Sequence, residues 1–284
     1  PTLSMQIQKL EEDLGVVLFD RAKKPILLTE VGRRVLEQMQ AVLFEAKKLE
    51  GIVSADTAQA LRGELVLGVI PTIAPYLLPR LLPVLERDYP NLDLNIREMQ
   101  TSRIIDALGA DEIDVGLLAT PLKAARIFEK PLFYEPFSVL CHSSHELGRQ
   151  KRIKYPSLKF GDIWLLEEGH CLRHQVLDVC SIRRSGGAKR RYEFESGSLE
   201  TLKNLVASYG GYTLLPYLAT EHLDDRTKLV DFEKPLPARE IGLAYRREHY
   251  KAPLIEALGA GILAALPEEL RKARARDFDV LGIA

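Results

Sequence analysis

The chain has 284 residues, a formal net charge of −1, 28% charged residues and three cysteines. Its length exceeds that of one typical domain, and its composition is that of a soluble globular protein. A net charge near zero excludes a basic chain with general affinity for nucleic acid, so any attraction to DNA must be local. Because three cysteines are too few for a secreted disulfide framework and no signal peptide or membrane segment is visible, we expect a cytoplasmic protein. We expect no metal site, no cofactor and no contact with a membrane.

The first fourteen residues predict a helix, since Gly15 follows as a stop and apolar residues recur at helical spacing. These are Leu3, Ile7, Leu10 and Leu14. Two short strands are expected at residues 16–19 and 26–28. Five basic residues stand against one acid between positions 21 and 34, as in a wing beside a DNA groove. From the helix alone, a solvated polar face looks the same as a groove-facing one.

Thr29 is expected to cap a long helix whose apolar residues follow a three-four spacing. They are Val35, Met39, Val42, Ala46, Leu49 and Val53. Such a seam is typical of a helix that pairs with another helix. The alternative is a packing face within the chain, but the polar run 54–62 suggests a linker and so favours dimerisation.

From Glu64 onward, predicted strands alternate with predicted helices, which is typical of an α/β fold with parallel sheets. The first set has strands at 65–70, 92–99 and 114–120, with helices at 71–87 and 102–108 between them. The second set has strands at 137–141, 163–166, 191–194 and 212–215, with a helix at 198–208. A strand at 241–245 and a helix at 253–266 are expected to return to the first sheet.

Thr72 and Thr101 follow the first two of these strands. Ligands of open α/β sheets bind beyond the carboxyl ends of the strands, so both hydroxyls are expected to face a cleft between two subdomains. The alternative is that each threonine only caps the next helix.

The segment 167–180 contains two of the three cysteines. Gly169 ends an apolar run, so Cys171 is expected in the first turn of a helix, and two cationic or imidazole side chains follow within three residues. A helix N-terminus and nearby cations lower a thiol pKa and favour the reactive thiolate. If residues 171–180 form one helix, the Cα atoms of Cys171 and Cys180 lie about 13.5 Å apart, whereas a disulfide needs about 4.4–6.8 Å. A disulfide would therefore require refolding; two buried structural thiols are the alternative.

Residues 1–36 resemble the DNA-binding domain of the LysR-type transcriptional regulators, from the second helix of the helix-turn-helix through the wing to the linker helix. The matching pattern is L-S-x-x-I-x-x-L-E-x-x-L-G-x-x-L-F-x-R, followed by L-T-x-x-G. The resemblance implies that Thr2, Ser4 and Met5 face a groove of double-stranded DNA and that Arg21 contacts phosphate. The family's first helix and turn would precede Pro1, so we expect this chain as it stands to bind DNA poorly.

The remainder also resembles LysR-type regulators, and most closely their hydrogen-peroxide-sensing branch. The matching segments are G-V-I-P-T-I-A-P-Y-L-L-P, E-M-Q-T, L-E-E-G-H-C-L-R-H-Q, S-L-E-T-L-K-N-L-V-A and I-G-L-A-Y-R. The resemblance implies an α/β regulatory domain with two lobes, similar to a periplasmic binding protein. Residues 1–59 would form a partial winged helix-turn-helix and dimerisation linker helix, and residues 63–284 the regulatory domain. Lobe I would comprise 63–135 and 238–270, and lobe II 136–237.

The resemblance also implies roles for single residues. Cys171 would attack peroxide and Cys180 would resolve the product as a disulfide. Five residues would bind peroxide beside the sulfur: Thr72, Thr101, His170, Arg173 and Arg246. The implied protein is a regulator and not an enzyme, and its partners are hydrogen peroxide, promoter DNA, RNA polymerase and further copies of itself, in a homodimer or homotetramer.

Two other functions remain open at this point. One is a LysR-type regulator that binds a small organic anion in the interlobe cleft, and the other is a thiol peroxidase. Three features depart from the peroxide-sensing pattern: residues 181–191 are longer and more basic, Cys141 has no role beyond a strand core, and the tail after Leu270 has no counterpart.

Overall fold

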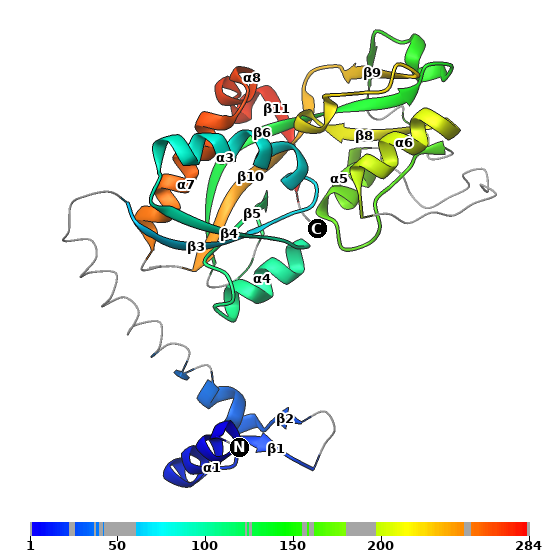
Figure 1. The fold of residues 1–284 in the computed structure, drawn as a ribbon. Coiled ribbons are helices and arrows are strands. Elements are labelled where there is room, and N and C mark those ends of the chain that lie inside the picture. Colours follow the sequence, from blue (N-terminus) through cyan, green and yellow to red (C-terminus); the bar gives the residue numbers. More distant parts are fainter. Residues whose placement is uncertain are drawn as a thin grey trace. The chain divides into compact units, whose positions relative to one another are not determined.

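The computed structural model describes a defined set of residues: 2–22, 26–36, 38–39, 42, 61–122, 124, 127–154, 158, 162–179, 197–246 and 251–282. The chain forms two compact units, Pro1–Ala58 and Gln59–Ala284 (Figure 1). Among the described residues, no helix is long and apolar enough to cross a membrane.

The first unit begins with α1 (Thr2–Leu14), as predicted. The helix ends at Gly15, whose φ of +65° is favourable for glycine, and the Gly15 amide donates to the carbonyl of Glu12. The two predicted strands pair antiparallel but are short, β1 (Phe19–Asp20) and β2 (Leu27–Leu28). This hairpin is the expected wing.

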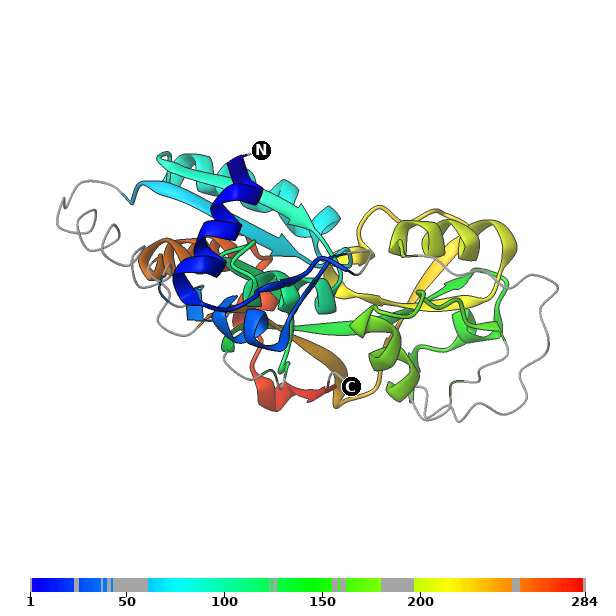
Figure 2. The ribbon, with the colours of Figure 1, turned by 90° about the horizontal axis from the view of Figure 1, so that it is seen from below.

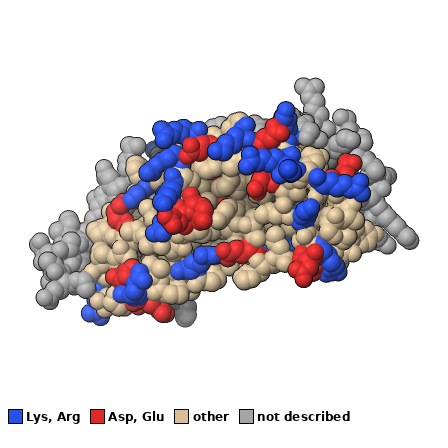
Figure 3. All heavy atoms as spheres, turned by 90° about the horizontal axis from the view of Figure 1, so that it is seen from above, with Lys and Arg blue, Asp and Glu red and all other residues tan. Residues whose placement is uncertain are grey.

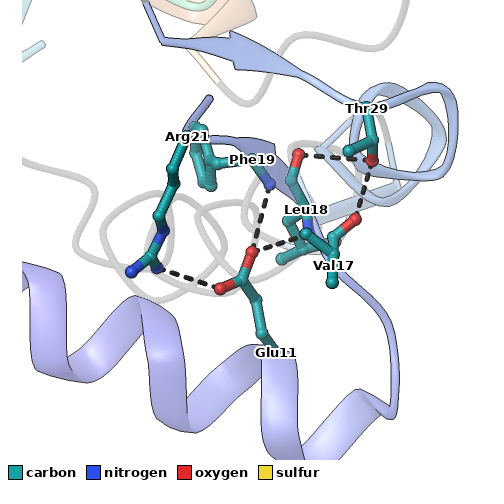
Figure 4. A network of polar contacts seen from close by, with 6 residues as sticks. All are labelled: Glu11, Val17, Leu18, Phe19, Arg21 and Thr29. Carbon is teal, nitrogen blue, oxygen red and sulfur yellow. Dashed lines mark hydrogen bonds and ion pairs between the residues drawn. The ribbon is translucent and has the colours of Figure 1, made fainter. Parts of the chain in front are cut away.

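Two polar side chains fix the hairpin to its flanking helices (Figure 4). The Glu11 carboxylate accepts hydrogen bonds from the amides of Leu18 at 2.7 Å and Phe19 at 3.1 Å, and these bonds lower the pKa of Glu11. The Thr29 hydroxyl donates to the carbonyl of Val17 at 2.7 Å and accepts from the amide of Gly32 at 2.8 Å. Thr29 is therefore the predicted helix cap.

The helix after Thr29 is described at residues 30–36, 38–39 and 42. Val42 is 60% exposed. Ala46, Leu49 and Val53 lie outside the described residues, so the seam remains a prediction.

In the second unit, three parallel strands form the first part of the sheet, and β3 lies between the other two. The strands are β3 (Gly63–Val69), β4 (Leu92–Glu98) and β5 (Val115–Thr120). The crossover helices are α3 (Ala74–Asp88) and α4 (Thr101–Gly109). The predicted alternation is confirmed, although α3 begins three residues later than predicted.

Two long strands connect the lobes. β6 (Ile127–His142) pairs antiparallel with β10 (Leu236–Arg246) along its first half and with β8 (Tyr212–Pro216) and β9 (Thr227–Phe232) near its end. β10 also runs antiparallel to β5. The sheet is therefore mixed: β3, β4 and β5 are parallel, as predicted, whereas the returning strands run antiparallel.

Lobe II also contains β7 (Arg152–Ile153), α5 (Cys171–Val179) and α6 (Leu199–Tyr209). The predicted strand at 163–166 is wrong, since Ile163 and Leu166 form only isolated bridges, that of Ile163 to Tyr212. Side chains hold this segment instead: the Trp164 indole donates to the carbonyl of Gly210, and the Thr213 hydroxyl donates to the carbonyl of Trp164. The predicted strand at 191–194 lies outside the described residues.

The chain returns to lobe I through α7 (Ala252–Ala265) and α8 (Glu268–Lys272). It ends in β11 (Phe278–Val280), which pairs parallel with the start of β10. Figure 2 shows this last strand, in red, beside β10. The tail without a family counterpart is therefore part of the sheet.

Each lobe has its own hydrophobic core. On the face shown in Figure 3, Lys and Arg side chains are interspersed with Asp and Glu. This mixed surface agrees with the net charge of −1. A mixed face exerts no strong general attraction on DNA.

Candidate functional site

Cys171 is the first residue of α5, as predicted, and its side chain is partly exposed. Gly169 immediately precedes this turn with a φ of +95°, a conformation that favours glycine. A Cβ on Gly169 would lie 2.8 Å from the Gln100 side-chain oxygen. The loop before the thiol is thus packed closely against the start of α4.

The Cys171 thiol donates to the Thr101 hydroxyl, with Sγ and Oγ1 3.1 Å apart. Thr101 is the first residue of α4 in lobe I, whereas Cys171 lies in lobe II. Neither α3 nor α4 has a side-chain cap. The capping interpretation of Thr72 and Thr101 is therefore wrong, and Thr101 bridges the two lobes at the sulfur.

A buried ionic network lies behind Thr72. Arg239, which is 1% exposed, donates to the Thr72 hydroxyl at 2.8 Å and to the Glu135 carboxylate at 2.9 Å. Arg239 and Glu135 are directly opposite on β10 and β6. Glu135 also accepts from the amide of Leu218 at 2.8 Å. The network fixes a cation near the thiol without exposing it to water.

Burial raises the pKa of the Cys171 thiol above its usual value, while the Thr101 hydrogen bond and the attraction of Arg239 act to lower it. The expected lowered pKa is therefore wrong, because desolvation of the thiolate outweighs its stabilising contacts. The predicted source of the positive charge beside the thiol is also wrong. The attraction comes from Arg239 on β10, and neither Arg173 nor His174 on α5 is among its causes.

His170 is buried and lies next to Cys171. Its Nε2 atom is 3.4 Å from the Gln100 side-chain nitrogen and 3.6 Å from the Glu167 carboxylate. Gln100 belongs to the turn before α4, so this cluster is a second contact between the lobes. His170 thus lies in the same corner of the site as Thr101.

The two predicted arginines have other partners. Arg173 donates to the carbonyl of Leu166 at 2.6 Å, which holds the chain before the site. Arg246 forms an ion pair with Asp111 at 2.7 Å. It lies seven residues along β10 from Arg239, roughly 23 Å in a strand. The structure thus places Arg239, and not Arg246, at the site.

Arg239 lies before the predicted strand at 241–245 and outside the I-G-L-A-Y-R segment, so neither pattern identified it. A signal was available, however. Arg239 and Glu135 are opposite charges within apolar strands, and buried charges are almost always paired.

The three cysteines have different surroundings. Cys141 is fully buried on β6, where burial raises its pKa, as expected for a strand core residue. Cys180 lies outside the described residues, as does the segment 181–191. The described helix α5 ends at Val179.

The residues predicted to contact DNA lie in the first unit. Ser4 and Met5 are exposed on α1, and Thr2 belongs to the same helix. Arg21 is 40% exposed and forms an ion pair with Glu11 at 3.0 Å. DNA contact by these residues remains a prediction.

Thr101→Val should slow alkylation of Cys171 at pH 7.5 by about three- to tenfold, because the thiolate loses a hydrogen-bond donor. Loss of this donor raises the pKa, so the pH–rate profile should move to higher pH. Iodoacetamide alkylation followed across pH checks the shift. Thr101→Ser, which keeps the hydroxyl, should react at nearly the normal rate; equal slowing of both variants would argue against the hydrogen bond.

Family models match most of the chain. Residues 1–33 match the bacterial regulatory helix-turn-helix proteins of the lysR family, and residues 58–267 match the LysR substrate binding domain.

Curated relatives are similar over nearly the full chain. The hydrogen peroxide-inducible genes activator of Dickeya chrysanthemi is 38% identical over 248 residues, covering 87% of this chain and 80% of that protein. The DNA-binding transcriptional dual regulator OxyR of Escherichia coli K12 is 36% identical over 280 residues, covering 96% and 90%.

Two solved structures show the same fold. A full-length OxyR variant from Pseudomonas aeruginosa has a TM-score of 0.81 and 35% identity, covering 97% of this chain and 88% of that one. A hydrogen peroxide-bound OxyR variant from Corynebacterium glutamicum has a TM-score of 0.69 and 30% identity, covering 93% and 83%. The chain therefore belongs to the LysR family of bacterial transcriptional regulators and, within it, to the OxyR group.

Proposed function

We propose that this regulator senses hydrogen peroxide through a reversible disulfide between Cys171 and Cys180. One observation carries the proposal: the partly exposed sulfur of Cys171, at a helix N-terminus, contacts Thr101 of the other lobe and is attracted to Arg239. A thiol with these neighbours has a hydrogen-bond donor and a cation to stabilise its thiolate.

The chemistry consumes one peroxide. The Cys171 thiolate attacks one peroxide oxygen, the O–O bond breaks, and a sulfenic acid and hydroxide form. The Cys180 sulfur then attacks the sulfenic sulfur, and the hydroxyl leaves as water. In total, two thiols and one peroxide give one disulfide and two waters. Thr72, Thr101 and His170 are the residues we propose to position peroxide, with Arg239 in the role expected of Arg246.

Forming this disulfide requires α5 to unwind. Cys171 and Val179 are the two ends of this helix, so their Cα atoms lie about 12 Å apart. One further Cα–Cα step of about 3.8 Å cannot reduce this separation to the roughly 6.8 Å limit for a disulfide. Oxidation would therefore become a change of fold in lobe II.

The proposal assigns DNA binding to residues 1–59 and sensing to residues 63–284. The helix-turn-helix family match and the transcriptional activators among the relatives support this assignment. We further propose that the protein acts in the bacterial cytoplasm as a homodimer or homotetramer on promoter DNA, together with RNA polymerase. Arg173 remains near the site through its bond to Leu166, and we assign it no direct peroxide contact.

Each chain is expected to consume one peroxide, after which consumption should cease because the disulfide is not reduced again. Peroxide consumption by the purified chain, measured without a reductant, checks it. Sustained consumption with a recycling reductant would instead indicate a thiol peroxidase. A thermal shift with small organic anions, combined with no change on peroxide treatment, would indicate the ligand-binding type of LysR regulator.

A further inference from the structure

The end of the chain lies next to the proposed switch. The LysR substrate binding domain match stops at residue 267, but the structure continues to residues 278–282, which we call the C-terminal strap. Within it, β11 pairs with residues 236–238 of β10, and the Leu281 amide donates to the carbonyl of Ala238 at 2.8 Å. The next residue of β10 is Arg239. The strap thus extends the sheet directly beside the buried cation.

The strap also contacts α5. The Gln175 side-chain amide donates to the carbonyl of Leu281 at 3.5 Å, and the Leu281 side chain packs against the core of lobe II. Figures 1 and 2 both show the red end of the chain beside α5. Gln175 lies four residues after Cys171, about one helical turn. One short segment therefore contacts both the cation strand and the thiol helix.

Gln175 has a second property that bears on the switch. Its side chain is fully buried, and among the described residues its carbonyl oxygen has no hydrogen-bond partner. A buried acceptor without a partner lowers the stability of the conformation that buries it. The packed helix α5 is thus stabilised by the strap and destabilised by its own Gln175.

We propose that the C-terminal strap holds α5 as a helix, that the unpaired Gln175 oxygen opposes it, and that the two together determine how readily the Cys171–Cys180 disulfide forms. This inference rests on the proposed function, because it requires that disulfide. The strap favours the reduced form, and the unpaired Gln175 oxygen favours unwinding. The two variants described below should therefore change the switch in opposite directions.

Removal of the strap tests the first part. A chain that ends at Asp277 should form sulfenic acid at Cys171 at the normal rate, within about twofold, because the thiol and its contacts remain. Its disulfide should form faster and be about tenfold more stable towards reduction, so the midpoint potential becomes about 30 mV more negative. Rapid-mixing kinetics and titration against a dithiol buffer give both values. Leu281→Ala should show the same direction with a smaller change, which provides the measurement if the shortened chain does not fold.

Gln175→Met tests the second part, because it removes the unpaired oxygen at nearly constant volume and only a long hydrogen bond to Leu281. Its disulfide should form more slowly and be easier to reduce, by about three- to tenfold. Leu229→Ala, an exposed leucine on β9, should leave both quantities unchanged. The inference would be overturned if removal of the strap left the midpoint potential of the disulfide unchanged, or if it slowed sulfenic acid formation as much as it changed disulfide formation. It would also be overturned if strap removal and Gln175→Met changed the potential in the same direction. If the unaltered chain forms no disulfide at all, the proposed function fails first.

Discussion

Arg239→Met should slow the reaction of Cys171 with peroxide at pH 7.5 by at least about tenfold, because the thiolate loses its buried cation. It should also destabilise the regulatory half by about 3–5 kcal/mol, since Glu135 is 0% exposed and would keep a buried charge without its partner. Denaturant unfolding measures the stability, and single-turnover kinetics measure the reaction.

A paired variant separates the two effects. Arg239→Met combined with Glu135→Gln removes both charges while keeping an acceptor for the Leu218 amide. It should recover most of the lost stability but none of the reactivity. Recovery of the reaction rate in the double variant would show that Arg239 acts only through the fold.

Cys171→Ser should abolish the response to peroxide, because no other described thiol combines partial exposure with the contacts to Thr101 and Arg239. Cys180→Ser should stop the reaction at a sulfenic acid on Cys171, which dimedone traps and mass spectrometry locates.

Cys141→Ser is the matched control and should behave as the unaltered chain, since Cys141 is buried in the lobe II core. Preferential dimedone labelling of Cys180 would reverse the roles assigned to the two cysteines.

Local spacing predicted the helices well because their causes are local. Thr29 caps its helix through the amide three residues later, and Gly169 precedes the first turn of α5, as the sequence indicates. The strand predicted at 163–166 was wrong, because an apolar run alone does not distinguish a strand from a buried loop held by side chains such as Trp164.

The site could be predicted only in part. The thiol and the two threonines follow from the motif, but the pKa of Cys171 depends on burial and on Arg239, which lies 68 positions away in the sequence (239 − 171 = 68). Arg246 is in the matching segment, yet the register of β10 directs it to Asp111 at the other end of the strand. Such long-range pairing is not visible in local composition.

Peptide mapping under non-reducing conditions, before and after one equivalent of peroxide, tests the central claim most directly. Trypsin cuts after Arg173, so the peptides that contain Cys171 and Cys180 separate unless a disulfide joins them. We predict a linked pair that is lighter by about two hydrogens, with Cys141 still free to alkylate. Retention of all three thiols, or a disulfide from Cys171 to Cys141, would contradict the account.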